Sequence, residues 1–323
     1  MLVATAVALA VYAARRLVRT PPDELAAHTD APITDYEQAV ARFAEVLRQE
    51  KRSGPHNPVC HSKLLTHGRK MERAIILMHG MTNCPEQFAR LAPLFFERGY
   101  NVLIPLMPCN GLLDPDTEAL KDVTAEQLRD CSNSMIDIGR GLGEHLTFAG
   151  ISAGATMAAW VAQNRSDVDQ AVLIAPAFTI ARGLRVRPSR LVMHLLLTMP
   201  NVMTQRFRPF TGAVGHNYRG FATRGLGQVM RLGFSVYDAA RTRKPAVQSV
   251  VVITNAADPA VGNSITRELL DRWRAGGLER AEICEFDASH HLIHDVIDPR
   301  QEQEQTALVY PILLNLIAPP VEA

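Results

Sequence analysis

The sequence has almost no net charge, because 34 lysines and arginines are balanced by 33 aspartates and glutamates. Nucleic-acid-binding proteins usually carry a clear excess of basic side chains. The overall composition therefore does not favour a nucleic-acid partner. Hydrophobic residues make up 47% of the 323-residue chain and charged residues 21%, which is typical of a globular protein with a substantial core.

Cysteines are few, and their spacing is irregular. No pair has CxxC spacing, so the sequence predicts neither a zinc site nor a redox motif. We expect mainly reduced, partly buried thiols. A Cys60–Cys84 disulfide stays open as an alternative, because both residues flank what look like adjacent strands. The cysteines are Cys60, Cys84, Cys109, Cys131 and Cys284.

The N-terminal apolar run, Met1–Ala14, is shorter than the ~20 residues of a standard membrane span and lacks the positive start of a secretory signal. Arg15, Arg16 and Arg19 follow it and would favour an orientation with the rest of the chain on the cytoplasmic side. Two interpretations stay open: a membrane anchor, or a helix on the protein body, in which case we expect a cytoplasmic protein. With the proline-containing linker behind it, this segment spans residues 1–32.

Beyond residue 32, short apolar runs alternate with amphipathic helices, and no repeat interrupts them. This order is typical of an α/β fold with a parallel sheet covered on both faces. The predicted strands are 63–66, 74–78, 101–106, 146–149, 171–175, 250–254 and 281–286. The predicted helices are 36–51, 85–98, 123–138, 153–163, 191–199, 226–240, 264–273 and 301–317.

One five-residue motif carries the main chemical signal. Gly150-Ile-Ser152-Ala-Gly154 lies directly after a predicted strand and directly before a predicted helix. A hydroxyl held in such a tight, strained turn is exposed to a base, and the flanking glycines allow the strand and helix to approach closely. The motif predicts Ser152 as the nucleophile of an ester hydrolase.

Candidates for the acid and the base follow in the order Ser, Asp, His, which is the chain order of α/β-hydrolases. Asp258 comes after the strand 250–254, and a histidine cluster comes after the strand 281–286. The histidine would accept the serine proton, and Asp258 would fix its tautomer. His290, His291 and His294 all compete for the role of base. A metal cluster of His291, His294 and Asp295 is the less favoured alternative.

The tetrahedral intermediate of ester hydrolysis needs two N–H donors for its oxyanion. Ala153, directly after the nucleophile at a helix N-terminus, supplies one backbone N–H. The turn after the strand 74–78 contains His79-Gly80-Met81, which predicts the N–H of Met81 as the second donor.

Taken together, these segments resemble bacterial carboxylesterases and monoacylglycerol lipases of the α/β-hydrolase superfamily. The resemblance implies an eight-stranded sheet, no cofactor or metal, His291 as the base, and a cap inserted after the sixth strand. One departure is Pro108-Cys-Asn110-Gly111, where relatives often have Pro-Gly-His-Gly. The matching residues are 79–85 with Phe88, 99–102, 150–154, Asp258 with Val261, and Ser289 with His291-Leu292-Ile293.

The predicted cap spans residues 179–248, between core segments 33–178 and 249–323. From Thr179 to Pro245 it has twelve basic residues and one acid, Asp238. We expect its apolar helix faces to cover the acyl pocket. An anionic membrane surface is a further predicted partner of the cap and the N-terminal segment. Solvated or acid-paired arginines are the competing interpretation, and an anionic substrate is a third.

The predicted function is hydrolysis of a carboxylic ester through an acyl-enzyme intermediate. A medium-length acyl chain on a small alcohol, as in a monoacylglycerol, is the expected substrate type. Acyl transfer to another acceptor and cleavage of small peptides are alternatives with the same triad. A binding module that has kept the fold without catalysis is an alternative of a different class.

Overall fold

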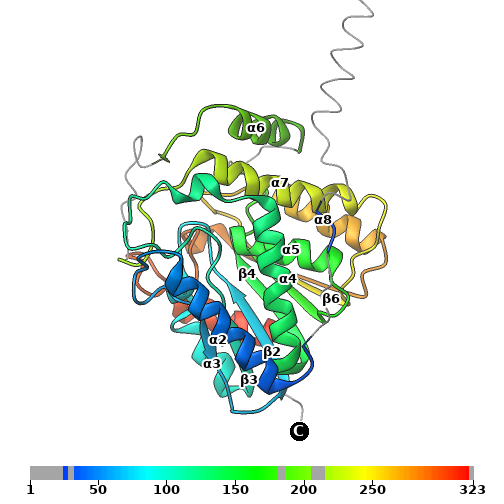
Figure 1. Cartoon of the computed structure of the whole chain (residues 1–323). Helices are drawn as coiled ribbons and strands as arrows, with labels where there is room; N and C mark the ends of the chain where they lie inside the picture. The colour runs from blue at the N-terminus through cyan, green and yellow to red at the C-terminus, as the bar shows by residue number, and fades with distance from the viewer. Residues whose placement is uncertain (1–24, 28–32, 180–185, 205–214, 320–323) are drawn as a thin grey trace, which may run out of the picture.

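A seven-stranded sheet forms the centre of the molecule in the computed structural model, which describes residues 25–27, 33–179, 186–204 and 215–319 (Figure 1). The strand order is β1-β3-β2-β4-β5-β6-β7, and all pairs are parallel except the short edge pair β1–β3. The strands are β1 Lys63–Leu65, β2 Met71–Met78, β3 Tyr100–Ile104, β4 Gly143–Ile151, β5 Gln170–Ile174, β6 Ser249–Asn255 and β7 Arg280–Phe286.

All seven apolar runs that the sequence predicts as strands form strands, within a few residues at each end. The count of eight, which came from the family resemblance, is wrong for the part of the chain that the structure describes. Its sheet has seven strands, so the predicted cap follows the fifth of them, β5, rather than the sixth.

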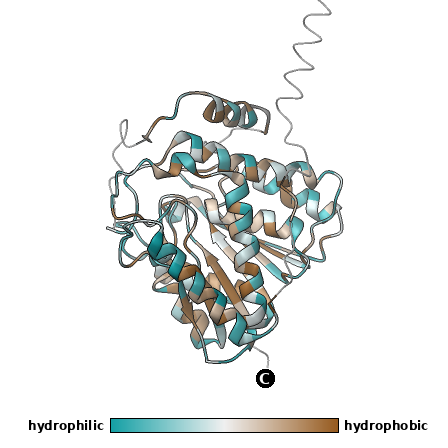
Figure 2. Ribbon diagram, viewed as in Figure 1, coloured by the Kyte–Doolittle hydropathy of each residue, from teal (hydrophilic) through white to brown (hydrophobic). Residues whose placement is uncertain are grey.

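Helices cover both faces of the sheet, as predicted. Alternate residues of β2 point to opposite faces, so Ala74, Ile76 and Met78 join a different core cluster from Ile75 and Leu77. The first cluster includes residues of α2, α4, α5 and α8, and the second includes residues of α3 and α9. Figure 2 shows the apolar strands between these helical layers. The helices are α2 Tyr36–Arg52, α3 Leu91–Glu97, α4 Ala125–Leu142, α5 Ala153–Asn164, α8 Ser264–Ala275 and α9 Thr306–Ile317.

Local sequence explains where some of these helices begin. Thr124 and Gln127 form a capping box that starts α4. The single helix predicted for residues 85–98 is divided into a 3₁₀ turn, Pro85–Phe88, and α3. The closing helix α9 begins at Thr306, five residues later than predicted. None of these differences moves the strand ends that carry the candidate catalytic residues.

Two helices lie between β5 and β6, where the sequence predicts the cap: α6 Val186–Thr198 and α7 Thr223–Ala239. Helix α7 packs on α4 and α5, and α6 packs on α7, on the side away from the sheet (Figure 1). The apolar segment Met1–Ala14 lies outside the described residues. Within the described ranges, no helix is both long and apolar enough to cross a membrane.

Candidate active site

Ser152 lies in a sharp turn between β4 and α5. Its backbone has φ 57° and ψ −114°, a conformation that non-glycine residues rarely adopt. The Ser152 amide donates to the carbonyl oxygen of Ile174 at 2.9 Å, and its own carbonyl oxygen accepts from Thr156 and Ala177. These backbone bonds hold the strained turn expected of a nucleophile that must project from the sheet edge.

The two glycines of the motif are required because other parts of the backbone lie very close to their Cα atoms. A Cβ atom at Gly154 would lie 2.2 Å from the carbonyl oxygen of Met78, because α5 crosses β2 at this point. A Cβ atom at Gly150 would lie 2.2 Å from the carbonyl oxygen of Gly154. Both separations are far below contact distance, so any larger residue would move the helix that follows Ser152.

Asp258 lies in the turn after β6 and is almost completely buried. Its Oδ1 accepts the backbone N–H groups of Ala260 at 2.8 Å and Val261 at 3.0 Å. Its Oδ2 is 2.8 Å from Nδ1 of His294. Burial alone would raise the pKa of Asp258, but the bonds from His294 and the two amides lower it, so the carboxylate is charged at neutral pH.

The histidine that joins Asp258 to Ser152 is His294. Its Nε2 is 2.9 Å from Oγ of Ser152, and its Nδ1 contacts Asp258. The sequence-based choice of His291 is therefore corrected: His291 is exposed at the end of a short 3₁₀ turn, and His290 is exposed beside it. Because both ring nitrogens of His294 have these partners, the alternative cluster with His291 and Asp295 is not assembled, and the described residues contain no metal-binding group of three such side chains.

The loop after β7 explains why the nearer histidines do not reach Ser152. Asp287 caps a 3₁₀ turn, Ala288–His290, and His291 ends it in the left-handed conformation with φ 49°. Leu292 then enters the core, and Asn255 donates to its carbonyl oxygen at 2.7 Å. Only after this anchor does the chain return to the serine, three residues beyond the predicted base.

The pKa of His294 reflects two opposed effects. Burial disfavours the protonated ring, whereas the hydrogen bond and negative charge of Asp258 favour it, and the net result is a raised pKa. A base with a raised pKa accepts the serine proton more readily. The arrangement thus supports proton transfer from the Ser152 hydroxyl to Nε2, with Asp258 stabilising the charged ring.

Both predicted oxyanion donors flank Ser152. The amide of Ala153 is the first of α5, where a helix has no internal acceptor. Met81 follows Gly80, where an added Cβ would lie 3.7 Å from Cβ of Ser152. Within the described part of the chain, neither amide has a protein acceptor. The two groups are thus available to a substrate oxygen beside the serine.

Asn110 and Gln87 hold the turn after β2, and neither residue was predicted from the sequence to have this role. Asn110 donates from Nδ2 to the carbonyl oxygens of Met81 at 2.6 Å and Asn83 at 2.9 Å. Asn110 belongs to the segment that departs from the family pattern, and that departure was the signal that marked this loop. Gln87 Oε1 accepts the amide of Gly80 at 2.9 Å.

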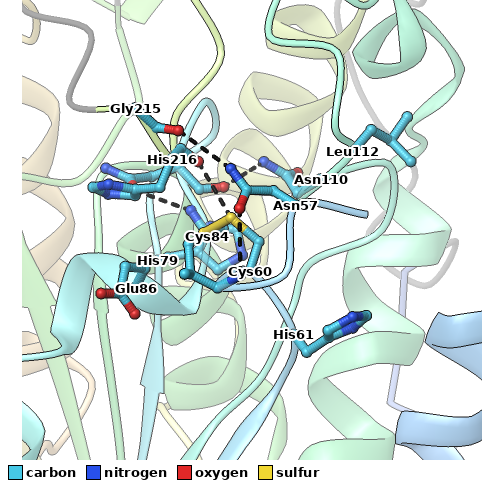
Figure 3. The surroundings of a disulfide bond; sticks show 12 residues. Asn57, Cys60, His61, His79, Cys84, Glu86, Asn110, Leu112, Gly215 and His216 are labelled. Atoms are coloured by element: carbon cyan, nitrogen blue, oxygen red, sulfur yellow. Dashed lines mark hydrogen bonds between the residues drawn. A yellow bond between two sulfur atoms is a disulfide. The ribbon is translucent and has the colours of Figure 1, made fainter. Parts of the chain in front are cut away.

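Cys60 and Cys84 form a disulfide beside this turn (Figure 3). Both residues are fully buried, and their Cα atoms are 5.2 Å apart. Gly215 and His216, from the predicted cap, lie beside the disulfide. The carbonyl oxygen of His216 is 3.3 Å from Sγ of Cys60, and the carbonyl oxygen of Gly215 accepts a hydrogen bond from the side chain of Asn57 at 3.2 Å. The disulfide thus joins the loop before β1 to the turn that carries Met81.

Known structures share this fold. The chain resembles a monoacylglycerol lipase from Paleococcus ferrophilus with a TM-score of 0.60 and 14% identity, over 79% of this chain and 97% of that one. One of the metagenome-derived lipolytic enzymes LipS and LipT gives a TM-score of 0.57 and 16% identity, over 80% and 98% of the two chains. A soluble variant of monoglyceride lipase from Saccharomyces cerevisiae gives 0.57 and 12% identity, over 79% and 89%.

A comparison with curated proteins finds no match to this sequence. A family model does match, over residues 75–303, and its description is the alpha/beta hydrolase family. The matched range includes Ser152, Asp258, His294 and both predicted oxyanion donors. Since it covers well over half of the chain, the protein belongs to the alpha/beta hydrolase family.

Proposed function

We propose that this protein hydrolyses carboxylic esters through an acyl-enzyme intermediate on Ser152. The observation that carries the proposal is the continuous hydrogen-bonded series from Ser152 Oγ to His294 at 2.9 Å and from His294 to Asp258 at 2.8 Å. A serine hydroxyl is a weak nucleophile unless a base removes its proton during attack. This series supplies the base and the acid that orients it.

In the proposed first half-reaction, Ser152 Oγ attacks the ester carbonyl carbon while its proton passes to Nε2 of His294. The carbonyl oxygen gains negative charge and accepts hydrogen bonds from the amides of Met81 and Ala153. Preorganised donors of this kind stabilise the transition state by about 3–4 kcal/mol each. The C–O bond to the alcohol then breaks, and His294 returns the proton to the departing alkoxide.

In the second half-reaction, water attacks the acyl group on Ser152. His294 accepts one proton from this water and delivers it to Oγ, which releases the carboxylic acid and restores the enzyme. No step calls for a metal or an organic cofactor. The similar structures described as monoacylglycerol and monoglyceride lipases support an ester with a small alcohol, such as a monoacylglycerol, as the substrate class. We propose a medium-length acyl chain for this ester.

The proposal is tested by turnover of p-nitrophenyl esters with acyl chains from about two to about sixteen carbons, beside a monoacylglycerol series. We expect kcat/KM in the ordinary enzyme range of about 10⁴ M⁻¹s⁻¹ or more for the best ester. The expected maximum lies at medium chain length. A folded wild-type protein that hydrolyses none of these esters would contradict the proposed function.

We further propose that the cap contacts an anionic lipid surface. Leu191, Leu195 and Met199 are 58%, 49% and 57% exposed and recur every four residues along α6 and just past its end, so they form one apolar row. Helix α6 is the outer helix of the cap (Figure 1). An exposed apolar row on a segment with excess positive charge is typical of interfacial helices.

The paired arginines of the cap reduce the charge available for this contact. Arg190 pairs with Asp238, Arg219 with Asp116 and Arg231 with Glu126. The competing interpretation of acid-paired arginines therefore applies to these three. The twelve basic residues between Thr179 and Pro245 still leave the segment positive after these pairs are counted.

Vesicle binding tests the cap proposal. We expect the protein to bind vesicles with anionic lipids several-fold more tightly than neutral ones, and added salt should weaken this preference. Replacing Leu191, Leu195 and Met199 together with serine should lower binding at least about tenfold, because apolar burial supplies most of the affinity. The control changes Leu113 and Ile283, exposed apolar residues outside α6, to serine. Equal, weak binding to both vesicle types would remove the proposal.

A further inference from the structure

Asn83 is a buried residue in the turn after β2 that bonds in four directions. Its backbone N–H donates to the carbonyl oxygen of Gly80 at 3.0 Å. Its carbonyl oxygen accepts from Asn110, and its Oδ1 accepts from the amide of Cys84. The remaining group, Nδ2, donates to Oδ2 of Asp295 at 3.3 Å. This last bond joins the turn to a residue 212 positions later, on the loop that carries the base.

The bond to Gly80 bears directly on the proposed oxyanion donor. The peptide group between Gly80 and Met81 is planar and trans, so its C=O and N–H point in opposite directions. Whatever holds the oxygen of Gly80 therefore also aims the N–H of Met81. That oxygen has two partners, the amide of Asn83 and Nδ1 of His79 at 2.8 Å.

The hydrogen-bond partners of His79 determine which of its ring nitrogens carries the hydrogen. Its Nε2 accepts the amide of Met107 at 3.0 Å, so Nδ1 carries the hydrogen and donates to Gly80. Burial lowers the pKa of His79 to about 4, which keeps the ring neutral. The second partner, Asn83, is in turn fixed by Asp295.

Asp295 follows His294 directly in the chain and is surrounded by donors. Its Oδ2 accepts from Asn83 and from Nε2 of Gln301 at 3.1 Å. Its Oδ1 accepts the amides of Ile297 at 3.4 Å and Asp298 at 3.2 Å. A carboxylate can accept from all of these groups, whereas an amide side chain in the same place would present a donor to at least one donor.

We propose that Asn83 and Asp295 are positioning residues that fix the turn after β2, which carries the proposed oxyanion donor Met81, relative to His294. This inference rests on the proposed ester hydrolysis. The base and the oxyanion donor act on the same transition state, but they lie on loops far apart in sequence. A displacement of about 1 Å between such groups can cost about 100-fold in rate. The Asn83–Asp295 bond is a direct side-chain link between these two loops, and Gln87, which accepts the amide of Gly80, also hydrogen-bonds Asp295.

The experiment compares Asp295→Asn, Asn83→Asp and the two changes combined. Each single change places two donors or two carboxylates face to face, and we expect kcat to fall about 10- to 100-fold with KM within about threefold. The combined variant restores one amide and one carboxylate with exchanged positions. Its kcat should exceed that of either single variant by about tenfold, a recovery that loss of stability alone does not produce.

Asp298→Asn is the matched control. Asp298 is a completely buried carboxylate on the same loop, but its side chain bonds His216 and Arg300 rather than the turn. The change removes the negative charge that pairs with His216 and Arg300, and the loss of a buried ion pair mainly lowers stability. We therefore expect a lower melting temperature, while kcat of the folded protein stays within about threefold of the wild-type value.

Two outcomes would overturn the proposed positioning role of Asn83 and Asp295. One is single variants with wild-type kcat, and the other is a combined variant that is no more active than the weaker single variant. Either result, obtained with a wild type that hydrolyses esters, would leave the proposed function intact. A wild type without ester turnover would overturn the proposed function and the positioning role together.

Discussion

Replacing His294 with alanine is expected to lower kcat for ester hydrolysis by about 10⁵- to 10⁶-fold, the loss typical of removing the base from a serine triad. The same change at His291 should leave kcat within about threefold. The reason is geometric, since His294 contacts both Ser152 and Asp258 and His291 is exposed on the loop surface. The measurement is steady-state hydrolysis of the best p-nitrophenyl ester by both variants.

The pH dependence of kcat/KM gives this prediction a second readout. His294 acts as a base only when its ring is neutral, so activity should rise with pH as the ring loses its proton. Because Asp258 raises the pKa of His294 above its ordinary value of 6.5, the midpoint of this rise should lie above pH 6.5. His291→Ala should keep the same midpoint. An inactive His291 variant beside an active His294 variant would contradict the assignment.

Replacing Ser152 with alanine should lower kcat by about 10⁶-fold, because no nucleophile then remains to form the acyl-enzyme. Ser53→Ala, which removes an exposed hydroxyl at the end of α2, is the control and should keep full activity. Retained turnover in a purified Ser152→Ala protein would contradict the role of this serine.

Stability measurements on the same position separate function from fold. Ser152 has φ 57°, which glycine adopts without steric cost and other residues do not. Ser152→Gly should therefore be inactive yet more stable than Ser152→Ala, by up to about 1–3 kcal/mol if the strain is fully released. A thermal or denaturant unfolding curve gives the difference. Equal stability of the two variants would show that the turn stores no strain.

Much of the fold follows from local patterns in the sequence. The buried parallel strands are short continuous apolar runs, whereas the helices have apolar residues spaced three or four positions apart. The two patterns can therefore be told apart in the sequence. The divided helix at residues 85–98 was not predicted, because apolar spacing continues across the 3₁₀ turn and the break. Sheet order, in contrast, depends on contacts between distant strands, and the resemblance overstated the strand count.

Ser152 and Asp258 were predictable because Ser152 directly follows the recognisable strand β4 and Asp258 lies three residues after the recognisable strand β6. The base was not, because its distance from β7 depends on the conformation of the intervening loop. One local signal pointed the right way: Asp287, two residues before Ser289, has the spacing of a capping residue and predicts a turn there. His290 and His291 lie in this turn and at its end, so the histidine that reaches Ser152 has to come later in the chain.

The Cys60–Cys84 disulfide and the arginine pairs of the cap depend on tertiary contacts. Cys60 is brought to Cys84 by a loop anchored at Asn57, whose amide donates to Gly111 at 2.8 Å. Nothing in the spacing of the cysteines determines that bond. In the same way, Arg231 finds Glu126 only because α7 packs on α4. The sequence could offer these pairings only as alternatives.

Labelling with a fluorophosphonate tests directly whether Ser152 is an activated nucleophile, since this reagent forms a stable bond only with a serine that is activated in this way. We expect one phosphonyl group per wild-type chain, mapped by mass spectrometry to the peptide that contains Ser152. His291→Ala should react at the wild-type rate, and His294→Ala should react far more slowly. A folded wild type that resists the reagent, or a label on any other residue, would contradict the assignment of Ser152 as the nucleophile.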